Sequence, residues 1–277
     1  MEMNKVQVRN IVIGEGMPKI CAPIVGRSKE EILLQVRELK AAEPDLAEWR
    51  ADWFEKALEK EYLLQRTWGG AIKPIGTAKE MSYQTRETKY LKEKAAIAQA
   101  AYDYIEEGNT IYIDSGTTTF ELVKLLRQKP KQNILIATNA FDHATELIGI
   151  DELRIIFAGG EIRHDSRATS GYITTDTIRK MIFDKVFIGI EHISYEHGIT
   201  TPNIQEADLK QTILNSAKQC FVLADYSKFW DDSLIQVNVP QKLYQVITDW
   251  HITKEEIKRF NAKGIHCIVA PDLTGEQ

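Results

Sequence analysis

The sequence predicts an α/β protein with a doubly wound, mostly parallel sheet, preceded by a partial β/α segment at the N-terminus. From residue 110 onward, short apolar runs rich in β-branched residues alternate with stretches of helical periodicity. This alternation is typical of a parallel sheet covered by helices on both faces. The expected strands are residues 111–114, 134–139, 154–158, 185–190, 220–225, 245–249 and 266–269, and the expected helices are residues 119–127, 140–147, 174–181, 204–217 and 254–262.

Composition excludes several classes of protein. The chain has 277 residues, of which 43% are hydrophobic and 27% charged, as in ordinary globular proteins. A net charge of −5 argues against a generally basic surface for nucleic acid. No stretch approaches the roughly 20 apolar residues of a membrane span, and the N-terminus lacks a secretory pattern. We therefore expect a cytoplasmic protein without a membrane partner, and the scattered histidines and cysteines predict no metal and no cofactor.

The first sixty residues have β/α character. Residues 6–13 and 19–26 read as strands, and Ser28 followed by Glu31 forms a capping-box pattern at the start of a helix. Residues 46–54 read as a third strand, on which Glu48 and Arg50 share one face. Such a pair is a structural ion pair as often as a functional one.

Residues 14–26 and 45–52 resemble the start of type I 3-dehydroquinate dehydratase, whose fold is an eight-stranded β/α barrel. The resemblance covers residues 4–60 and implies that Glu48 and Arg50 correspond to residues that contact the substrate. The family's Schiff-base lysine, its partner histidine and a later arginine have no matching positions here. Three strands cannot close a barrel, so we do not expect dehydratase activity.

The region between this segment and the alternating pattern reads as a connector followed by a helix. Residues 55–65 are charged and helix-prone, and residues 66–74 are rich in turn residues. Residues 79–107 show one long helical pattern that ends at Gly108. Arg86 and Lys94 lie on this helix and are expected to be solvated.

The stretch from Ile111 to Glu121 organises the candidate site. An apolar strand leads into Asp114, Ser115 and Gly116, and then into Thr117, Thr118 and Thr119 at the start of a helix. Unpaired backbone N–H groups and the helix dipole at such a terminus suit an anion, most often a phosphate. Alternatively, Asp114 or Ser115 simply caps the helix.

Similar residues follow the other predicted strands, at the edge where parallel sheets bind ligands. Ordinary turn residues explain such a group of small, hydroxyl-bearing and charged side chains at one or two strand ends. Their occurrence at five strand ends favours a pocket for a polyol or a sugar phosphate. Glu206 and Lys210 share a helix face, as a surface ion pair would, and Lys228 either neutralises a phosphate or is a solvated lysine. Residues 163–167 form a polar loop that could close over a ligand. The further candidate site residues are Thr138, Asn139, Gly159, Gly160, Glu161, Gly189, Glu206, Lys210 and Lys228.

Six motifs follow one another from about residue 62 to the end: residues 66–71, 114–119, 138–139, 157–160, 184–189 and 224–228. With these motifs the region resembles the C-terminal effector-sensing domain of DeoR-family transcription regulators. The resemblance implies the fold shared with ribose-5-phosphate isomerase and glucosamine-phosphate deaminase. It also implies a phosphorylated sugar effector, with its phosphate on the loop Ser115–Thr119, and a homo-oligomer.

The N-terminal segment departs from that family. A DeoR regulator carries a winged helix-turn-helix with a Thr-Ile-Arg-Arg-Asp run, and residues 1–61 lack this run. We therefore expect two domains, residues 1–61 and 62–277, arranged as a fusion, and DNA binding is doubtful. The leading prediction is a non-enzymatic sensor. The alternative is a sugar-phosphate isomerase, which needs a carboxylate base; Asp114, Glu161 and Glu206 are the candidates.

Overall fold

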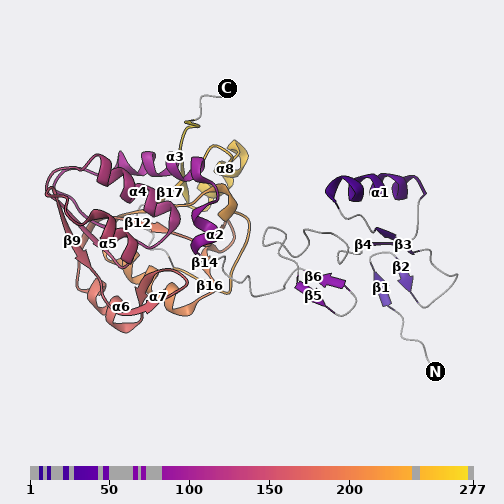
Figure 1. Cartoon of the computed structure of the whole chain (residues 1–277), viewed down its shortest axis with the longest axis horizontal. Helices are drawn as coiled ribbons and strands as arrows, with labels where there is room; N and C mark the ends of the chain where they lie inside the picture. Colours follow the sequence, from indigo (N-terminus) through magenta and orange to yellow (C-terminus); the bar gives the residue numbers. More distant parts are fainter. Residues whose placement is uncertain are drawn as a thin grey trace. The chain divides into compact units, whose positions relative to one another are not determined.

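The computed structural model consists of two compact units, residues 1–76 and residues 77–277 (Figure 1). The expected boundary between residues 61 and 62 stays a prediction. The structure describes residues 6–8, 11–13, 21–24, 28–42, 46–49, 65–67, 70–72, 83–238 and 244–273.

A seven-stranded, all-parallel sheet forms the centre of the second unit. The strand order reverses between β7 and β12, because the chain first winds outward through β8 and β9 and then in the other direction through β15, β17 and β18. This order confirms the doubly wound α/β class. In spatial order the strands are β18 (His266–Val269), β17 (Tyr244–Thr248), β15 (Ala217–Leu223), β12 (Phe183–Gly189), β7 (Thr110–Ile113), β8 (Ile134–Thr138) and β9 (Leu153–Phe157).

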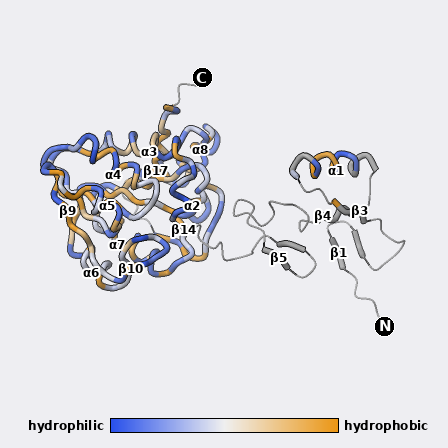
Figure 2. Tube along the Cα trace, in the orientation of Figure 1, coloured by the Kyte–Doolittle hydropathy of each residue, from blue (hydrophilic) through white to orange (hydrophobic). Residues whose placement is uncertain are grey.

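Alternate side chains of these strands enter two hydrophobic cores. On β7, Ile111 and Ile113 pack with one core, whereas Tyr112 packs with the other. The helices α3 (Leu91–Tyr102), α4 (Thr117–Gln128) and α5 (Phe141–Leu147) contribute to the first core, and α6 (Tyr172–Arg179), α7 (Ile204–Asn215) and α8 (Lys254–Ala262) to the second. In Figure 2 these helices alternate between hydrophilic and hydrophobic stretches, as expected of helices that each bury one side.

The long helix expected over residues 79–107 is wrong, because the structure has two helices there. Three residues separate the end of helix α2 (Tyr83–Glu87) from the start of α3. Tyr90 at the junction has a φ of 55°, which is a left-handed conformation that interrupts the helix. Helix α3 also stops at Tyr102, six residues before Gly108.

Several short strands lie in segments expected to be loops. Strands β10 (Glu161–Arg163) and β11 (Ala168–Ser170) form an antiparallel hairpin that includes the predicted closing loop. Strands β13 (His192–Ser194), β14 (Gly198–Thr201) and β16 (Ile235–Gln236) form a small antiparallel sheet. Runs of two to four residues are too short for a periodicity to reveal them.

The first unit contains one β/α/β element among its described residues. Strands β3 (Cys21–Ile24) and β4 (Leu46–Trp49) are parallel, and helix α1 (Lys29–Ala42) connects them. The backbone N–H of Glu31 donates to Ser28 Oγ at 3.3 Å, so the expected N-cap is present. The single strand expected over residues 6–13 is instead an antiparallel pair, β1 (Val6–Val8) and β2 (Ile11–Ile13).

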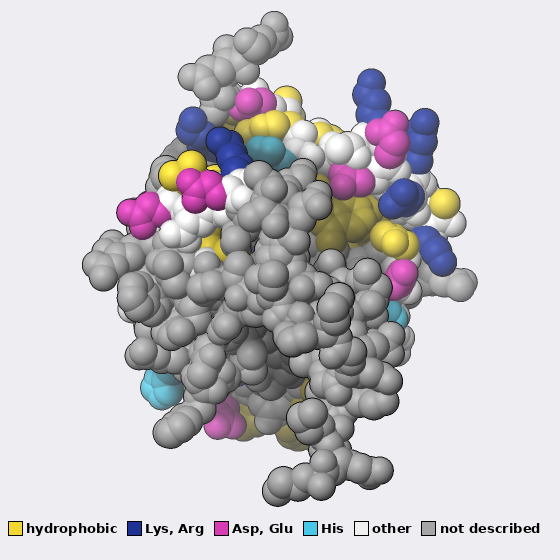
Figure 3. All heavy atoms as spheres, turned by 90° about the vertical axis from the view of Figure 1, so that its right-hand side faces the viewer, with side chains coloured by type: hydrophobic (Ala, Val, Ile, Leu, Met, Phe, Trp, Pro, Cys, Tyr) yellow, Lys and Arg dark blue, Asp and Glu magenta, His cyan; other side chains and the backbone are white. Residues whose placement is uncertain are grey.

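The other described strands of this unit are β5 (Gln65–Thr67) and β6 (Gly70–Ile72), which pair antiparallel. Glu48 lies on β4, but its side chain is not among those described, and Arg50 and residues 55–64 lie outside the described residues. Helix α1 exposes Leu33 and Leu34. Figure 3, viewed from the right-hand side of Figure 1, shows hydrophobic side chains among charged ones on this face of the molecule.

Candidate functional site

The candidate site lies at the carboxyl ends of β7 and β12, where the strand order reverses. The backbone N–H of Asp114 donates to the carbonyl of Phe187 at 2.9 Å, which joins the two strand ends. Gly116 and Gly189 then approach so closely that a Cβ added to Gly116 would lie 3.9 Å from Gly189 Cα. Two small hollows open here, and Ser115 lines both. The local turn and the neighbouring strand thus build one site with two sides.

We call the first hollow the carboxylate side. Its centre is the Lys210 ammonium, which lies 2.9 Å from Asp114 Oδ2 and 3.4 Å from Glu206 Oε1. Lys210 also donates to the carbonyl of Gly189 at 2.8 Å, and its side chain is only 1% exposed. The lining residues are Asp114, Ser115, Asn139, Arg163, Ser166, Ala168, Thr169, Ser170, Glu206, Leu209 and Lys210.

Two further charged residues extend this network. Arg163, on β10, places its Nη1 3.2 Å from Glu206 Oε2, so the hairpin reaches across to helix α7. Glu191 also lies within hydrogen-bonding reach of Glu206. Burial opposes ionisation of Glu206, but Lys210, Glu191 and Arg163 outweigh it and lower its pKa to about 2. Although burial favours the neutral amine, Asp114, Glu191 and Glu206 hold the pKa of Lys210 above its usual range.

Asn139 is held in place by both ends of its amide. Its Oδ1 accepts a hydrogen bond from the Tyr112 hydroxyl at 2.9 Å, and its Nδ2 donates to the carbonyl of Thr169 at 2.9 Å. Asn139 therefore ties the end of β8 to β7 and to the hairpin β10–β11. It shapes the wall of the carboxylate side.

We call the second hollow the cationic side. Arg86, from α2, and Lys228, from the short 3₁₀ helix η2 (Tyr226–Lys228) after β15, lie on it together with the N-terminus of α4. Gly116 is the N-cap of α4 and supplies no side-chain cap, and the first turn contains no acidic residue. Its lining residues are Arg86, Ser115, Gly116, Thr117, Thr118, Gly189, Ile190, Glu191 and Lys228.

Lys94 adds a third positive charge near this hollow. Its side chain is buried and its ammonium donates to the backbone carbonyl of Arg86. Burial lowers the pKa of Lys94 to about 8; attraction by Asp225 opposes this change, while repulsion by Lys228 and Arg86 adds to it. The expectation of a solvated Lys94 is therefore wrong.

The structure brings together most of the predicted residues but not all of them. The hydroxyl of Thr119 lies 2.7 Å from the Asp114 carbonyl, so it closes the turn instead of facing a hollow. Thr138 Oγ1 accepts from the backbone N–H of Ala140 at 3.1 Å. Three more of the candidates line neither hollow, because Gly159 and Gly160 lie just before β10 and Glu161 is its first residue.

The structure bears on three of the simpler interpretations of the sequence: a surface ion pair, a helix cap and a solvated lysine. Glu206 and Lys210 are not a surface ion pair, because Lys210 is buried beside Asp114 and the Glu206 side chain is only 12% exposed. Neither Asp114 nor Ser115 caps helix α4. Lys228 is half-buried at the hollow. Arg163 belongs to the predicted closing loop, and the structure brings it to Glu206. Sequence reasoning did not place Arg86, Lys94 and Glu191 in the site, because only the folded chain brings them to it.

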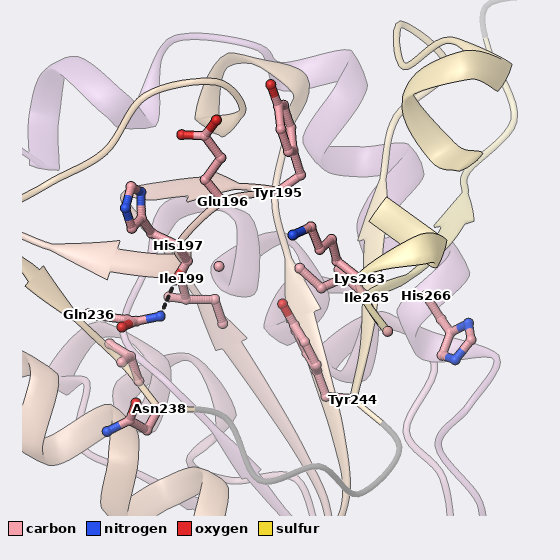
Figure 4. A pocket seen from close by; sticks show the side chains of 13 residues that line it. Tyr195, Glu196, His197, Ile199, Gln236, Asn238, Tyr244, Lys263, Ile265 and His266 are labelled. Carbon is pink, nitrogen blue, oxygen red and sulfur yellow. Dashed lines mark hydrogen bonds between the residues drawn. The ribbon is translucent and has the colours of Figure 1, made fainter. Parts of the chain in front are cut away.

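A larger hollow lined by described residues lies elsewhere, at the amino ends of β17 and β18. Figure 4 shows its side chains, among them Glu196, Lys263 and His266, pointing in different directions instead of converging on one point. Tyr244 lines it, and the Tyr244 hydroxyl is buried without a partner. We favour the smaller site at the strand carboxyl ends, because charged groups converge there.

The described residues contain neither a group of metal ligands nor a helix suited to a bilayer. In the part of the chain that the structure describes, no three His, Cys, Asp or Glu side chains are grouped as a metal site would require. Among the same residues, no helix has the length and apolar character needed to cross a bilayer.

Comparison with protein families gives two matches. Residues 89–250 match the DeoR C-terminal sensor domain, and residues 20–107 match type I 3-dehydroquinase. Both resemblances seen in the sequence are thus confirmed. The second match extends past residue 60 and overlaps the first over residues 89–107.

Individual relatives are transcription regulators by name. The chain is 30% identical to HTH-type transcriptional regulator GlpR of Haloferax volcanii, over 76% of this chain and 81% of the relative. It is 35% identical to FruR of Bacillus subtilis, over 64% of this chain and 69% of the relative. It is 28% identical to the glycerol-3-phosphate regulon repressor of Escherichia coli, over 72% of this chain and 82% of the relative.

A solved D-ribose-5-phosphate isomerase in complex with phospho-erythronic acid matches 50% of this chain and 53% of its own, with a TM-score of 0.37 and 19% identity. The fold class rests on the strand order of the sheet. The family match covers more than half of the chain, and the relative from Haloferax volcanii is matched over four-fifths of its length. The chain therefore belongs to the DeoR family of transcription regulators, through its C-terminal sensor domain.

Proposed function

We propose that the second unit is a sensor that binds a phosphorylated sugar and does not transform it. The observation that carries this proposal is the two-sided site, in which Ser115 lies between a cationic hollow and a carboxylate hollow. A sugar phosphate has the matching asymmetry, with an anionic group at one end and hydroxyl donors at the other.

The cationic side suits the phosphate. The first-turn N–H groups of α4 have no intrahelical partners, and the dipole of this twelve-residue helix favours negative charge at its start. Thr117 and Thr118 line the hollow with their hydroxyl-bearing side chains, and Lys228 supplies a positive charge. A phosphate there would accept hydrogen bonds from both backbone and side chains.

The carboxylate side suits the hydroxyl groups of the sugar. Ionised carboxylates are acceptors only, so Asp114 and Glu206 favour ligand groups that donate. Because Lys210 and Arg163 hold these carboxylates in fixed positions, the pattern of acceptors is preorganised. Selection among sugars would then depend on how many hydroxyl groups meet these oxygens.

The relatives' names support the same class of ligand. One relative is called the glycerol-3-phosphate regulon repressor, which links that regulator to a phosphate ester of a polyol. This chain is 28% identical to it, so the class of effector carries over more safely than the particular compound.

A sugar-phosphate isomerase is the rival function. Isomerisation needs a carboxylate that is free to take a proton from the substrate. Here Asp114 and Glu206 are both paired with Lys210, and Glu161 lies outside the site. We expect no turnover of ribose 5-phosphate in a coupled assay, and measurable turnover would favour the isomerase.

We propose further that this chain does not bind DNA strongly by itself. Its net charge is −5 and residues 1–61 lack the Thr-Ile-Arg-Arg-Asp run. The described residues of the first unit include one helix, α1, so they contain no pair of helices that could form a helix-turn-helix. A gel shift at modest salt tests this expectation, and a sequence-selective shift would contradict it.

Thermal unfolding with a panel of sugar phosphates tests the sensor proposal. A ligand at a hundredfold excess over its Kd stabilises the native state by about 2.7 kcal/mol. We expect one compound to raise the Tm selectively, and Lys228→Ala to abolish the shift. Lys218→Ala is the matched control, because Lys218 is an exposed lysine paired with Asp184. If no compound changes the Tm, Ser115–Thr118 only forms the start of a helix and the proposal fails.

A further inference from the structure

We propose that the phosphate of the effector also binds Arg86 and thereby fastens helix α2 to the sensor unit. Helix α2 would then be the element through which occupancy of the site reaches the first unit. This inference rests on the proposed function, since it needs an anion in the cationic hollow.

Helix α2 is the first described element of the second unit in chain order, following β6 of the first unit. Its Arg86 lines the cationic hollow together with Ser115–Thr118 on α4 and Lys228 after β15. A single small anion in this hollow would therefore contact three separate elements. Of these, only α2 lies next to the connection with the first unit.

Helix α2 depends on its neighbours for its position. It has five residues, well below the roughly 12 to 15 that an isolated helix needs. Side-chain contacts to it include the guanidinium of Arg167, which lies 5.2 Å from the centre of the Tyr83 ring, and the Lys94 ammonium, which donates to the Arg86 carbonyl. The Tyr83 hydroxyl is buried without a hydrogen-bond partner. The Tyr83 ring is buried but belongs to neither hydrophobic core, so a displacement of α2 would expose this ring without opening a core.

The junction between α2 and α3 permits such movement. Tyr90 has a left-handed backbone, which costs a bulky residue free energy and separates the two helices. Tyr90 and Leu91 are both about half exposed. Helix α3 itself is anchored in the core through Ile97 and its alanines. Helix α2 can therefore change position while α3 stays in place.

Charge makes the docked position of α2 sensitive to an anion. Arg86 and Lys228 each repel Lys94, whereas Asp225 and Glu121 attract it, and Glu191 also lines the hollow. A phosphate dianion in the hollow would add attraction to Arg86 and Lys228, and it gains the contact with Arg86 only while α2 is docked. It would bind the docked arrangement more tightly than an arrangement with α2 displaced, and this difference in affinity is what shifts the population.

Hydrogen exchange of the full chain with inorganic phosphate tests the inference. The backbone N–H groups of residues 84–90 report on α2, and those of residues 117–121 report on occupancy of the hollow. At a tenfold excess of phosphate over its Kd, we expect exchange of both segments to slow by about tenfold. In Arg86→Gln, measured at an excess that again saturates the site, phosphate should slow exchange in residues 117–121 but not in residues 84–90.

Arg127→Gln is the matched control, since Arg127 lies at the other end of α4 and pairs with Glu146. It should behave as the wild-type chain does. Protection of residues 117–121 alone in the wild-type chain would overturn the coupling and leave the sensor proposal intact. Equal protection of residues 84–90 in Arg86→Gln would also overturn the coupling. If phosphate and sugar phosphates protect neither segment, the phosphate site itself is refuted.

Discussion

The two sides of the site differ in how their positively charged side chains are paired. On the carboxylate side, Lys210 contacts Asp114 and Glu206, and Arg163 contacts Glu206, so each cation has a carboxylate partner. On the cationic side, the Lys94 ammonium donates to a backbone carbonyl. Lys228 makes no ion pair within the described part of the chain. The first side is a completed network. Glu191 also lines the second side, but the charge of Lys228 can still be balanced by an anion.

This difference separates the residues that maintain the fold from those that respond to a ligand. Removing one partner of a completed buried network leaves an uncompensated charge. Removing a buried cation that lacks a carboxylate partner relieves a desolvation cost instead. Stability and ligand affinity should therefore respond to different lysines.

The largest effect is expected on the carboxylate side, from Lys210→Met. It leaves Asp114 and Glu206 buried without their ammonium and should cost about 3–5 kcal/mol in the free energy of unfolding. Urea denaturation followed by circular dichroism measures the change. Lys218→Met is the control, since its exposed pair with Asp184 contributes about 0–1 kcal/mol. Equal losses in the two variants would show that the Lys210 network is not a completed one.

Lys94→Met should give the opposite result on the cationic side. We expect the free energy of unfolding without ligand to change by less than about 1 kcal/mol, because relief of the buried charge offsets the lost hydrogen bond. Phosphate affinity should fall about tenfold, which corresponds to about 1.4 kcal/mol. Calorimetry measures the affinity, and Lys92→Met, at an exposed position of the same helix, is the control. A loss of stability as large as that of Lys210→Met would contradict the comparison.

The two sides should also titrate in different pH windows. Lys94 has a pKa of about 8 in the folded chain and 10.5 as a free side chain. Between these values the unfolded chain binds the proton and the folded chain does not, so this group's contribution to stability rises with pH. Phosphate binding favours the protonated lysine, so affinity should fall above pH 8 by at most about tenfold per pH unit.

Glu206 behaves in the reverse sense. Its pKa of about 2 lies below its ordinary value of 4.5, so its contribution to stability is complete above pH 4.5 and is lost as pH falls toward 2. Denaturation curves and phosphate titrations at several pH values separate the two groups. In Lys94→Met the fall in affinity above pH 8 should disappear, and its persistence would assign the proton to another group.

The smallest effects are expected from two neighbouring threonines. Thr119→Val removes the hydroxyl that closes the turn onto the Asp114 carbonyl and should cost about 1 kcal/mol of stability. Thr118→Val removes a hydroxyl that lines the cationic hollow. It should lower phosphate affinity about threefold and leave the Tm nearly unchanged. The reverse pattern would show that Thr119 faces the ligand.

The sequence predicts the fold well where the pattern is long. Each of the seven strands expected from residue 110 onward is present, and residues 254–262 and 266–269 have the expected bounds. It fails where the pattern is local or ambiguous. The break at Tyr90 involves neither glycine nor proline, so helical periodicity continues through it. The strands of β10–β11 and β13–β14 are too short to show a period.

For the site, the sequence by itself determined the turn from Asp114 to Thr118, because a strand, a glycine and a helix start are properties of neighbouring residues. Only the tertiary structure decided which charged side chains pair with one another and which are buried. Asp114 and Lys210 lie 96 residues apart in the chain, and Lys94 becomes buried beneath the carbonyl of Arg86. The energy of a charge depends on its burial and on every group around it. The spacing of residues along the chain does not predict these neighbours, because they come together only when the chain folds.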